Sequence, residues 1–451
     1  MAYDVLIRRG SLVLPTKVVR GDVAIEGGLF AAIAPELAGP ASEEIDAAGL
    51  HLFPGVVDPH VHFNEPGRTE WEGAATGSAA LAAGGGTCFC DMPLNSSPPT
   101  LDGPSFDQKA AALAANSRTD FGLWGGLTPT NLDRLDELAE RGVIGFKAFM
   151  CASGIDDFTA ADDYTLWQGM QIAARLKLPV AVHAENETLT RVLARQAIAA
   201  GKTGVRDFLA SRPVVAELEA IQRAILLADE AGCSLHIVHV SCGRGVALVA
   251  EAQANGIDVT CETCPHYLVL TEDDRERLGA IAKCAPPLRS AEDQAQLWRA
   301  LLAGKIAFVA SDHSPAPASM KLAADFFQIW GGISGVQMTL SLLLAAGHEQ
   351  RGLTLSYLAK LTSRAAAERF RLAGKGCLEV GADADLALVD LSAAGPLEQN
   401  ELRDRHRLSP YVGYPLRGRV QRTLVRGQTV FHAGRLAGSP TGRLVTPNAR
   451  P

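Results

Sequence analysis

The sequence lacks the features that would direct the chain to nucleic acids or to a membrane. Acidic residues outnumber basic ones, 50 against 42, and no run of lysines and arginines offsets the net charge of -8. This balance disfavours binding to phosphate backbones. No apolar run approaches the roughly 20 residues needed to span a bilayer, and the first residues lack the basic start and apolar core of a signal peptide. We therefore expect a cytoplasmic protein that binds neither nucleic acid nor membrane.

The cysteines do not suggest a disulfide framework. There are nine, an odd number scattered through the chain, which is typical of reduced thiols packed in the interior. Cys261 and Cys264 have the spacing of a C-x-x-C zinc or redox motif, but no second such pair occurs in the sequence. Because they lie in and beside the predicted strand 257–261, we interpret them as core residues.

Both ends of the chain have the pattern of short β-strands. Apolar and polar residues alternate in runs such as 4–8 and 419–425, and Gly and Pro turns separate these runs. Neither end is long enough to bury a core alone. We therefore expect residues 1–52 and 373–451 to form one small β-sandwich together.

Residues 53–372 have a different pattern, in which short apolar strands are separated by longer segments rich in Ala, Leu, Glu and Arg. Such alternation predicts repeated βα units around a parallel sheet. The candidate strands end near His62, Pro93, Thr128, Met150, Glu185, Ser241, Tyr267 and Ser314. Eight units favour a closed (β/α)8 TIM barrel, whose chemistry lies at the carboxyl ends of the strands. A doubly wound open sheet is the alternative, but no Gly-x-Gly-x-x-Gly follows the first strand.

Side chains that can serve a metal site recur at these strand ends. They are His60, His62, Lys147, His183, His239 and Asp312. His60 and His62 are two positions apart on a strand, so both imidazoles face the same side and can bind one ion. Any one of these residues alone could be a core residue, but burying all of them around one axis without a shared partner would be costly. His236 precedes His239 by three positions, and we expect it to face away from the set.

Lys147 is the unusual member, because a protonated amine with a pKa of about 10.4 offers no lone pair to a cation. Carboxylation by carbon dioxide would convert it into an anionic carbamate, whose two oxygens can bridge two divalent ions. With Asp312 and a bridging hydroxide, such a cluster would keep about one positive charge, enough to hold hydroxide at neutral pH and polarise a carbonyl.

Taken together, these residues resemble the cyclic amidohydrolases, a family that includes dihydroorotases, dihydropyrimidinases or hydantoinases, and allantoinases. The resemblance covers nearly the whole chain. It implies that His60 and His62 bind the more buried ion. It also implies that His183 and His239 bind the second ion, with the carboxylated Lys147 as the bridge.

By the same resemblance, Asp312 would be both a ligand and the proton shuttle, taking the proton of the bridging hydroxide and returning it to the leaving nitrogen. Zinc is the expected metal, and manganese, cobalt or iron would suit the same ligands. The resemblance also implies a homotetramer or a dimer.

Two positions distinguish this chain from neighbouring branches of the family. Dihydroorotases typically have an arginine that holds the substrate carboxylate where this chain has Asn64. Hydantoinases usually have an oxyanion-binding tyrosine where this chain has Ala152. The pattern over residues 62–73 resembles that of the allantoinases, which implies a neutral cyclic ureide substrate, allantoin, opened to allantoate. A broad-specificity hydantoinase or dihydropyrimidinase is the main alternative; a dihydroorotase or a non-catalytic scaffold fits less well.

The substrate contacts leave a weaker trace in the sequence. By similarity to the hydantoinases, main-chain groups near Ala285 and Gly331 would hold the ring, and Asn95 would be a further polar contact. The loop 151–155 follows Lys147 directly, and we interpret it as a candidate lid in which Gly154 could act as a hinge.

Overall fold

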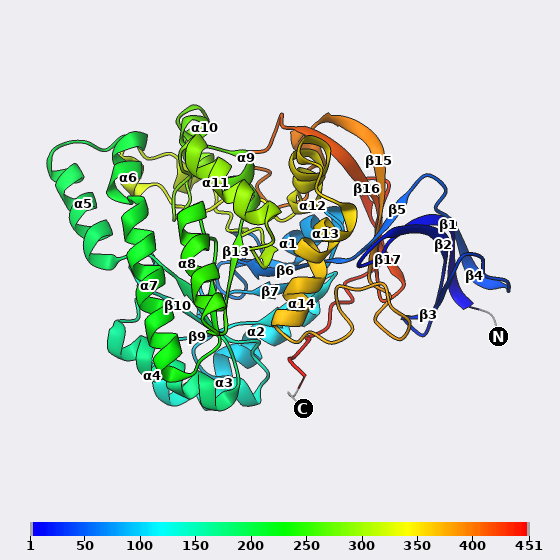
Figure 1. Cartoon of the computed structure of the whole chain (residues 1–451), viewed down its shortest axis with the longest axis horizontal. Coiled ribbons are helices and arrows are strands. Elements are labelled where there is room, and N and C mark those ends of the chain that lie inside the picture. Colours follow the sequence, from blue (N-terminus) through cyan, green and yellow to red (C-terminus); the bar gives the residue numbers. More distant parts are fainter. Residues whose placement is uncertain (1–2, 449–451) are drawn as a thin grey trace.

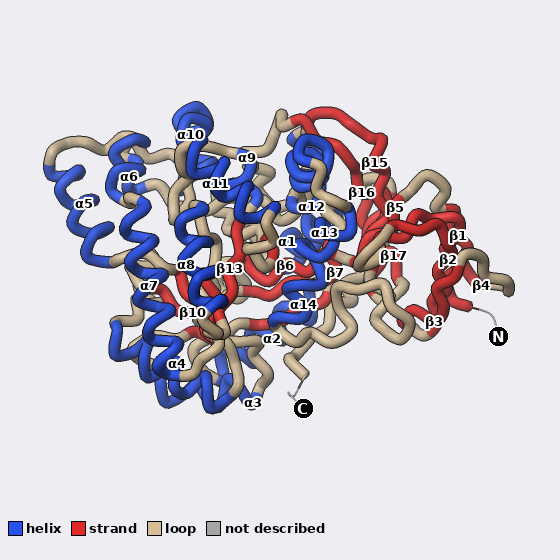
Figure 2. Tube along the Cα trace, in the orientation of Figure 1, coloured by secondary structure: helices blue, strands red, loops and turns tan. Residues whose placement is uncertain are grey.

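The computed structural model describes residues 3–448, which form a helix-wrapped barrel and, beside it, a region built mainly of strands (Figure 1). Figure 2 shows that the helices surround the barrel strands, whereas both chain ends contribute strands to the second region. Within this described range, no helix combines the length and the apolar composition needed to cross a bilayer.

The barrel strands run parallel and follow the chain in order. They are β6 (Val56–Val61), β7 (Gly86–Asp91), β8 (Asp120–Leu123), β9 (Gly125–Gly126), β10 (Phe146–Phe149), β11 (Val180–His183), β12 (Leu235–Ile237), β13 (Val259–Thr263) and β14 (Phe308–Val309). Strands β6 to β8 form one sheet and β9 to β14 another. Trp124 alone separates β8 from β9, so the two form one interrupted strand. The His62 amide donates to the His313 carbonyl at 2.8 Å, which joins the first strand position to the last and closes the predicted (β/α)8 barrel.

Three predicted strand ends are wrong by four or five residues. The strands expected to end near Ser241 and Ser314 end at Ile237 and Val309, and the residues after them lie in loops. The strand expected to end near Tyr267 ends at Thr263, and Tyr267 lies in the short helix α9 (Pro265–Val269). Pro265 occupies the first turn of that helix, where its fixed φ and missing N–H are tolerated. The proline therefore ends the strand earlier than its apolar sequence suggests.

The helices lie on the outside of the barrel. They are α1 (Ala74–Ala83), α2 (Gly103–Asn116), α3 (Leu135–Glu140), α4 (Asp163–Leu176), α5 (Glu187–Ala199), α6 (Val205–Ser211), α7 (Val214–Ala231), α8 (Gly243–Ala254), α9, α10 (Glu272–Leu278), α11 (Ala291–Leu302), α12 (Thr339–Leu343), α13 (Leu355–Ala359) and α14 (Ala365–Arg369). Side-chain caps start several of them: Asp102 accepts from the Ser105 amide at 2.9 Å and Asp162 from the Thr165 amide at 2.8 Å. Helix α7 turns small buried residues inward at every fourth position, such as Ala220 and Ala224, which lets it pack closely against the barrel.

The second region is one nine-stranded, mostly antiparallel sheet. Its strands are β1 (Tyr3–Val13), β2 (Val18–Glu26), β3 (Leu29–Ala34), β4 (Ala41–Asp46), β5 (His51–Pro54), β15 (Leu386–Pro396), β16 (Pro415–Val425), β17 (Gln428–His432) and β18 (Arg435–Leu436). Strand β5 pairs with β1 on one side and with β15 on the other, so it joins the two ends of the chain. The prediction of a β-region built from both termini is confirmed, while the boundaries drawn at residues 52 and 372 stay a prediction.

A buried ion cluster connects the barrel to this sheet. The Lys375 ammonium lies 2.5 Å from an Asp120 oxygen at the start of β8 and 2.8 Å from an Asp385 oxygen next to β15. Farther along, the Val445 amide donates to the Phe121 carbonyl at 2.7 Å, so the C-terminal segment pairs with the barrel. These contacts fix the sheet against the barrel, away from the carboxyl ends of the strands.

Candidate metal centre and substrate cavity

A cavity of about 570 Å³ lies where the barrel strands end. Every residue predicted for the site lines it except Lys147, which is fully buried behind Phe149, with its nitrogen 4.0 Å from the centre of that ring. Phe149 itself is part of the cavity wall. The structure thus brings the predicted residues to one place, although they are spread over most of the chain.

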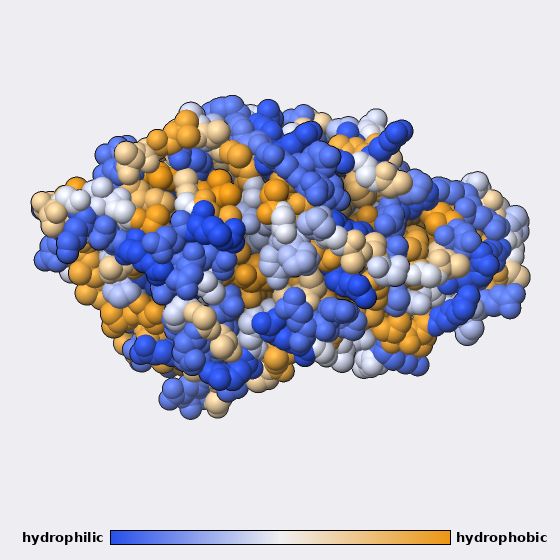
Figure 3. All heavy atoms as spheres, turned by 90° about the horizontal axis from the view of Figure 1, so that it is seen from above, coloured by the Kyte–Doolittle hydropathy of each residue, from blue (hydrophilic) through white to orange (hydrophobic). Residues whose placement is uncertain are grey.

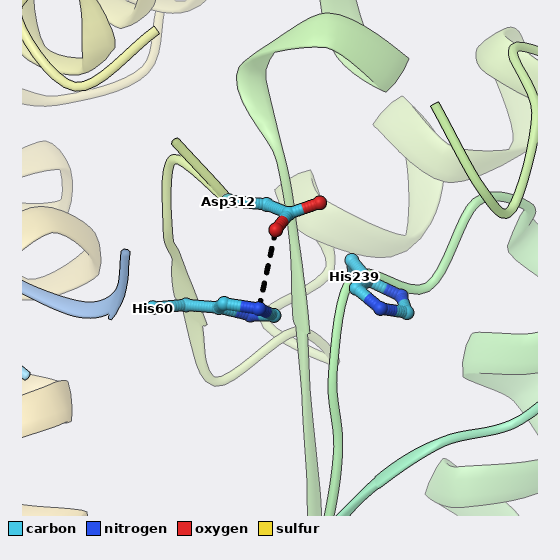
Figure 4. A group of neighbouring side chains, drawn as sticks. All are labelled: His60, His239 and Asp312. Atoms are coloured by element: carbon cyan, nitrogen blue, oxygen red, sulfur yellow. Dashed lines mark ion pairs between the residues drawn. The ribbon is translucent and has the colours of Figure 1, made fainter. Parts of the chain in front are cut away.

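Three of the predicted ligands form a tight group (Figure 4). The ligand atoms of His60, His239 and Asp312 all lie within 4.8 Å of one another, and each side chain comes from a different strand end. An Asp312 oxygen is 3.2 Å from His60 Nε2 and 3.5 Å from His62 Nε2. The Nε2 atoms of His60 and His62 and this carboxylate oxygen therefore converge, as ligands of one ion would.

His183 and His239 form a second converging pair. Nδ1 of His183 lies 3.0 Å from Nε2 of His239. Two nitrogens bound to one zinc ion at 2.0–2.1 Å in tetrahedral geometry would be about 3.3 Å apart. The pair therefore fits a second ion, next to the group formed by His60 and Asp312.

The backbone at two of these residues is strained. His239 has a φ of 40° and Asp312 a φ of 46°, in the left-handed region that residues with a Cβ rarely occupy. Such strain costs about 1–3 kcal/mol per residue and is concentrated at functional sites. Both residues follow short strands, and the left-handed turn sets where each side chain points.

Lys147 is in an unusual environment for a lysine. Its side chain is fully buried, and its nitrogen makes one hydrogen bond in the described chain, to the Ala148 carbonyl at 3.3 Å. Burial lowers the pKa of Lys147 to about 7. A large fraction of the amine is therefore neutral near pH 7 and carries the lone pair that carboxylation by carbon dioxide requires.

The ionisation of the other groups also suits a cation. Burial opposes the charge of Asp312, but His60 and His62 hold the pKa of this carboxyl well below its usual range. Burial, together with the nearby His183, lowers the pKa of His239 well below its usual value. Burial opposes the charge of His60, but Glu262 and Asp312 raise its pKa, so a metal ion would displace a proton from this ring. An ionised carboxylate beside imidazole nitrogens is a donor set suited to divalent metal ions, so the residues fit the metal centre expected from the sequence.

Several residues around this site did not stand out in the sequence. Glu262 on β13 contacts His60, and Glu185 accepts from His183 Nε2 at 2.8 Å while also pairing with Arg212. His236 does not line the cavity, as expected, but its Nε2 lies 3.1 Å from Glu262. The signal available for Glu262 was a charged residue inside an apolar strand, the same signal that identified Lys147.

The substrate side of the cavity is formed by loops. Asn95 donates from Nδ2 to the Ser314 hydroxyl at 3.3 Å and has a φ of 71°. Ala285 and Gly331 also line the cavity. Lys283 donates to the Phe326 carbonyl at 2.7 Å, and so helps to hold the loop that carries Gly331.

The candidate lid also borders the cavity. Ala152, Ser153 and Gly154 line it, and the Ala152 amide donates to Glu187 at 2.8 Å on α5. The hydroxyl of Ser153 donates to the Phe158 carbonyl at 2.6 Å, and Gly154 has a φ of 87°. The loop is thus anchored at Ala152 and Ser153, with a conformationally free glycine directly after them.

A closed barrel with this strand-end set defines a class of metal-dependent hydrolases, and comparison with known proteins identifies the family. Residues 51–430 match the family described as "Amidohydrolase family", whose members bind a metal centre. The chain belongs to this family and is a hydrolase.

The most informative relatives match over the full length of the chain. An allantoinase of Rubrobacter xylanophilus is 58% identical over 99% of this chain and 98% of its own. An allantoinase of Deinococcus radiodurans is 56% identical, with 100% of both chains covered. Among solved structures, the L-hydantoinase of Arthrobacter aurescens is 37% identical, with a TM-score of 0.96 over 98% of this chain and 100% of its own. The dihydropyrimidinase of Brevibacillus agri is 32% identical, with a TM-score of 0.92 over 99% of both chains.

Proposed function

We propose that this enzyme is an allantoinase, which hydrolyses a ring amide of allantoin to give allantoate in purine breakdown. The observation that carries the proposal is the 58% identity, over nearly the full length of both chains, to a relative named allantoinase. The strand-end group supports hydrolysis at a metal centre, because it combines imidazole nitrogens with an ionised carboxylate around one space.

In this proposal His60 and His62 would hold one ion, His183 and His239 would hold the other, and the carboxylated Lys147 would be a ligand of both. Zinc is the proposed metal. When bound, such ions lower the pKa of water and polarise a carbonyl oxygen. The buried position of Lys147 and the 3.0 Å approach of His183 to His239 support this assignment.

We assign the proton transfer to the side chain of Asp312. One of its oxygens lies next to His60 and His62, at the cavity wall where the ring amide would bind. Because its low pKa keeps it ionised, Asp312 can accept a proton from the attacking water and return it to the ring nitrogen as the amide bond breaks.

The cavity walls orient the ring and exclude water. We assign the main chain near Ala285 and Gly331 to the ring carbonyl and amide, and Asn95 to a polar contact. Asn64, which is buried and makes no side-chain hydrogen bond among the described residues, stands where a dihydroorotase would have its arginine. A neutral ring therefore suits the site better than an anionic one.

A homo-oligomer in the cytoplasm completes the proposal. Tyr164 on α4 is 65% exposed and Leu226 on α7 is 60% exposed, and Figure 3 shows apolar surface over the barrel end of the molecule. Exposed apolar surface of this kind is suited to contact between subunits. Light scattering coupled to size-exclusion chromatography would show a dimer or tetramer, and a monomer would contradict this part of the proposal.

The test of the substrate is a comparison of kcat/KM for allantoin, hydantoin, dihydrouracil and dihydroorotate with the zinc-loaded enzyme. We expect allantoin to have the highest value. A higher value for hydantoin or dihydrouracil would favour the broad-specificity hydantoinase suggested by the TM-score of 0.96 to the L-hydantoinase. Absence of bound metal and of any ring opening would favour a non-catalytic scaffold.

A further inference from the structure

Glu262 is a buried carboxylate in contact with two of the predicted metal ligands. It lies on β13, and its side chain is 1% exposed. One of its oxygens is 2.5 Å from Nδ1 of His60, and the other is 3.1 Å from Nε2 of His236. The first oxygen also accepts from the main-chain amide of His239 at 3.3 Å. One carboxylate thus contacts two proposed ligand residues on different strands.

The contact with Glu262 determines which ring nitrogen of His60 is available to bind a metal ion. When Nδ1 of His60 donates its proton to Glu262, Nε2 keeps its lone pair. Nε2 is the nitrogen that lies 3.2 Å from Asp312 and faces the rest of the ligand group. Fixing a histidine in this way, through the ring nitrogen that does not bind the metal, both orients the ring and makes it a stronger ligand.

The charge of Glu262 has no permanent counter-ion in the described part of the chain. Three other buried acids of the barrel each pair with a basic side chain: Asp91 with Lys109, Glu185 with Arg212, and Glu217 with Arg289. Within residues 3–448, no lysine or arginine nitrogen is within 4.0 Å of Glu262, whose ion-pair partners are two histidines. A buried negative charge without such a partner is costly unless a cation is nearby.

We infer that Glu262 is a positioning residue of the metal centre, which orients Nε2 of His60 toward the ions and supplies negative charge that they neutralise. The inference rests on the proposed function only in requiring that the site binds divalent metal. It does not depend on which ring is the substrate.

The experiment measures zinc retention by the purified full-length enzyme. Wild-type enzyme and Glu262→Gln are dialysed against zinc buffers of graded free concentration, and bound zinc is measured by mass spectrometry. We expect Glu262→Gln to need about 10- to 100-fold more free zinc for half-loading, which is the usual effect of removing a partner of this kind. Because glutamine keeps the size and one acceptor oxygen, the change mainly removes charge.

The matched control is Asp22→Asn in the distant nine-stranded sheet. Asp22 is also buried and accepts from the main-chain amides of Arg9 at 2.8 Å and Leu37 at 3.1 Å. Its replacement removes a buried carboxylate charge without touching the site. We expect zinc retention equal to that of the wild type, so that a loss in Glu262→Gln alone reports on the metal centre.

A second measurement separates positioning from general loss of structure. In cobalt-substituted enzyme, the visible absorption of the metal depends on its ligands, so altered coordination by His60 should change the bands of Glu262→Gln and leave those of Asp22→Asn unchanged. If Glu262→Gln does not fold, Glu262→Asp is used instead. It keeps the charge but does not reach Nδ1 of His60, and we expect at least a tenfold loss of zinc affinity.

The possible results distinguish this inference from the proposed function. Zinc retention and a cobalt spectrum equal to wild type in the Glu262 variant would overturn the inference and leave the proposed function standing. A wild-type enzyme that binds no divalent metal would overturn the proposed metal centre, and the inference with it.

Discussion

Replacing Lys147 by methionine should stabilise the metal-free enzyme, although it removes a residue that the proposed reaction needs. The lysine is fully buried, and its single hydrogen bond in the described chain is a long one, 3.3 Å to the Ala148 carbonyl. Burial lowers its pKa from the usual 10.5 to about 7. At about 1.4 kcal/mol for each pKa unit, burying this amine lowers the free energy of unfolding by about 4 kcal/mol at pH 7. Methionine has a similar length, needs no hydrogen bond and avoids this loss.

The difference in stability between Lys147→Met and the wild type depends on pH. Between pH 7 and 10.5, the unfolded chain binds a proton at Lys147 that the folded chain does not bind. The free energy of unfolding of the wild type therefore rises with pH across this window, and Lys147→Met lacks that contribution. The advantage of the variant should be largest below pH 7 and should decrease toward pH 10.5.

The assay is thermal unfolding of chelator-treated protein at pH 6.5, 8 and 9.5, followed by calorimetry. At pH 6.5 we expect Lys147→Met to melt a few degrees above the wild type, and the difference to narrow as the pH rises. After loading with zinc and bicarbonate the order should reverse, because only the wild type binds both ions. A metal-free variant that melts below the wild type at pH 6.5 would refute the reasoning.

Three further substitutions test other parts of the structure. Asp312→Asn should lower kcat for allantoin by about 10²- to 10⁴-fold by removing the proton acceptor, and a near-normal kcat in a steady-state assay would contradict that role. Gly332→Ala should raise KM by displacing the cavity loop that carries it. Gly332 has a φ of 129°, and an added Cβ would lie 2.0 Å from the Ser314 carbonyl oxygen. An unchanged KM would show that this loop does not contact substrate. Lys375→Met should destabilise the fold by about 3–5 kcal/mol, because it leaves Asp385 buried without a cation and Asp120 with Arg426 alone. That loss should lower the melting temperature and leave zinc content unchanged, whereas a melting temperature equal to the wild type would contradict it.

The barrel and the position of its site could be predicted from the sequence because both depend on local patterns. Each βα unit is a short apolar strand followed by a helix, and parallel strands place their carboxyl ends at the same rim. His183 and His239 are 56 positions apart in the sequence, but their positions at strand ends predicted that they lie close together. Their ring nitrogens are 3.0 Å apart. The alternation in the terminal segments predicted their strands in the same way.

The supporting contacts could not be predicted, because they join residues that no local pattern connects. Glu262 lies in a strand that is buried along most of its length, so its side chain could not be assigned to the cavity side by alternation. The flanking Cys261 and Cys264 also drew attention to a C-x-x-C spacing, although both are buried free thiols. The pairing of Arg212 with Glu185 depends on how α6 and α7 lie over the barrel, which only the folded chain determines.

Lys147 is the residue on which the whole account depends. Its role requires that its buried nitrogen carries a carboxyl group when the enzyme is loaded with metal. A crystal structure of the zinc-loaded enzyme, grown in the presence of bicarbonate, tests this directly. We expect density for three further atoms on Nζ of Lys147, with two ions held between the carbamate and the histidines. An unmodified lysine in an enzyme that still opens allantoin would contradict the account.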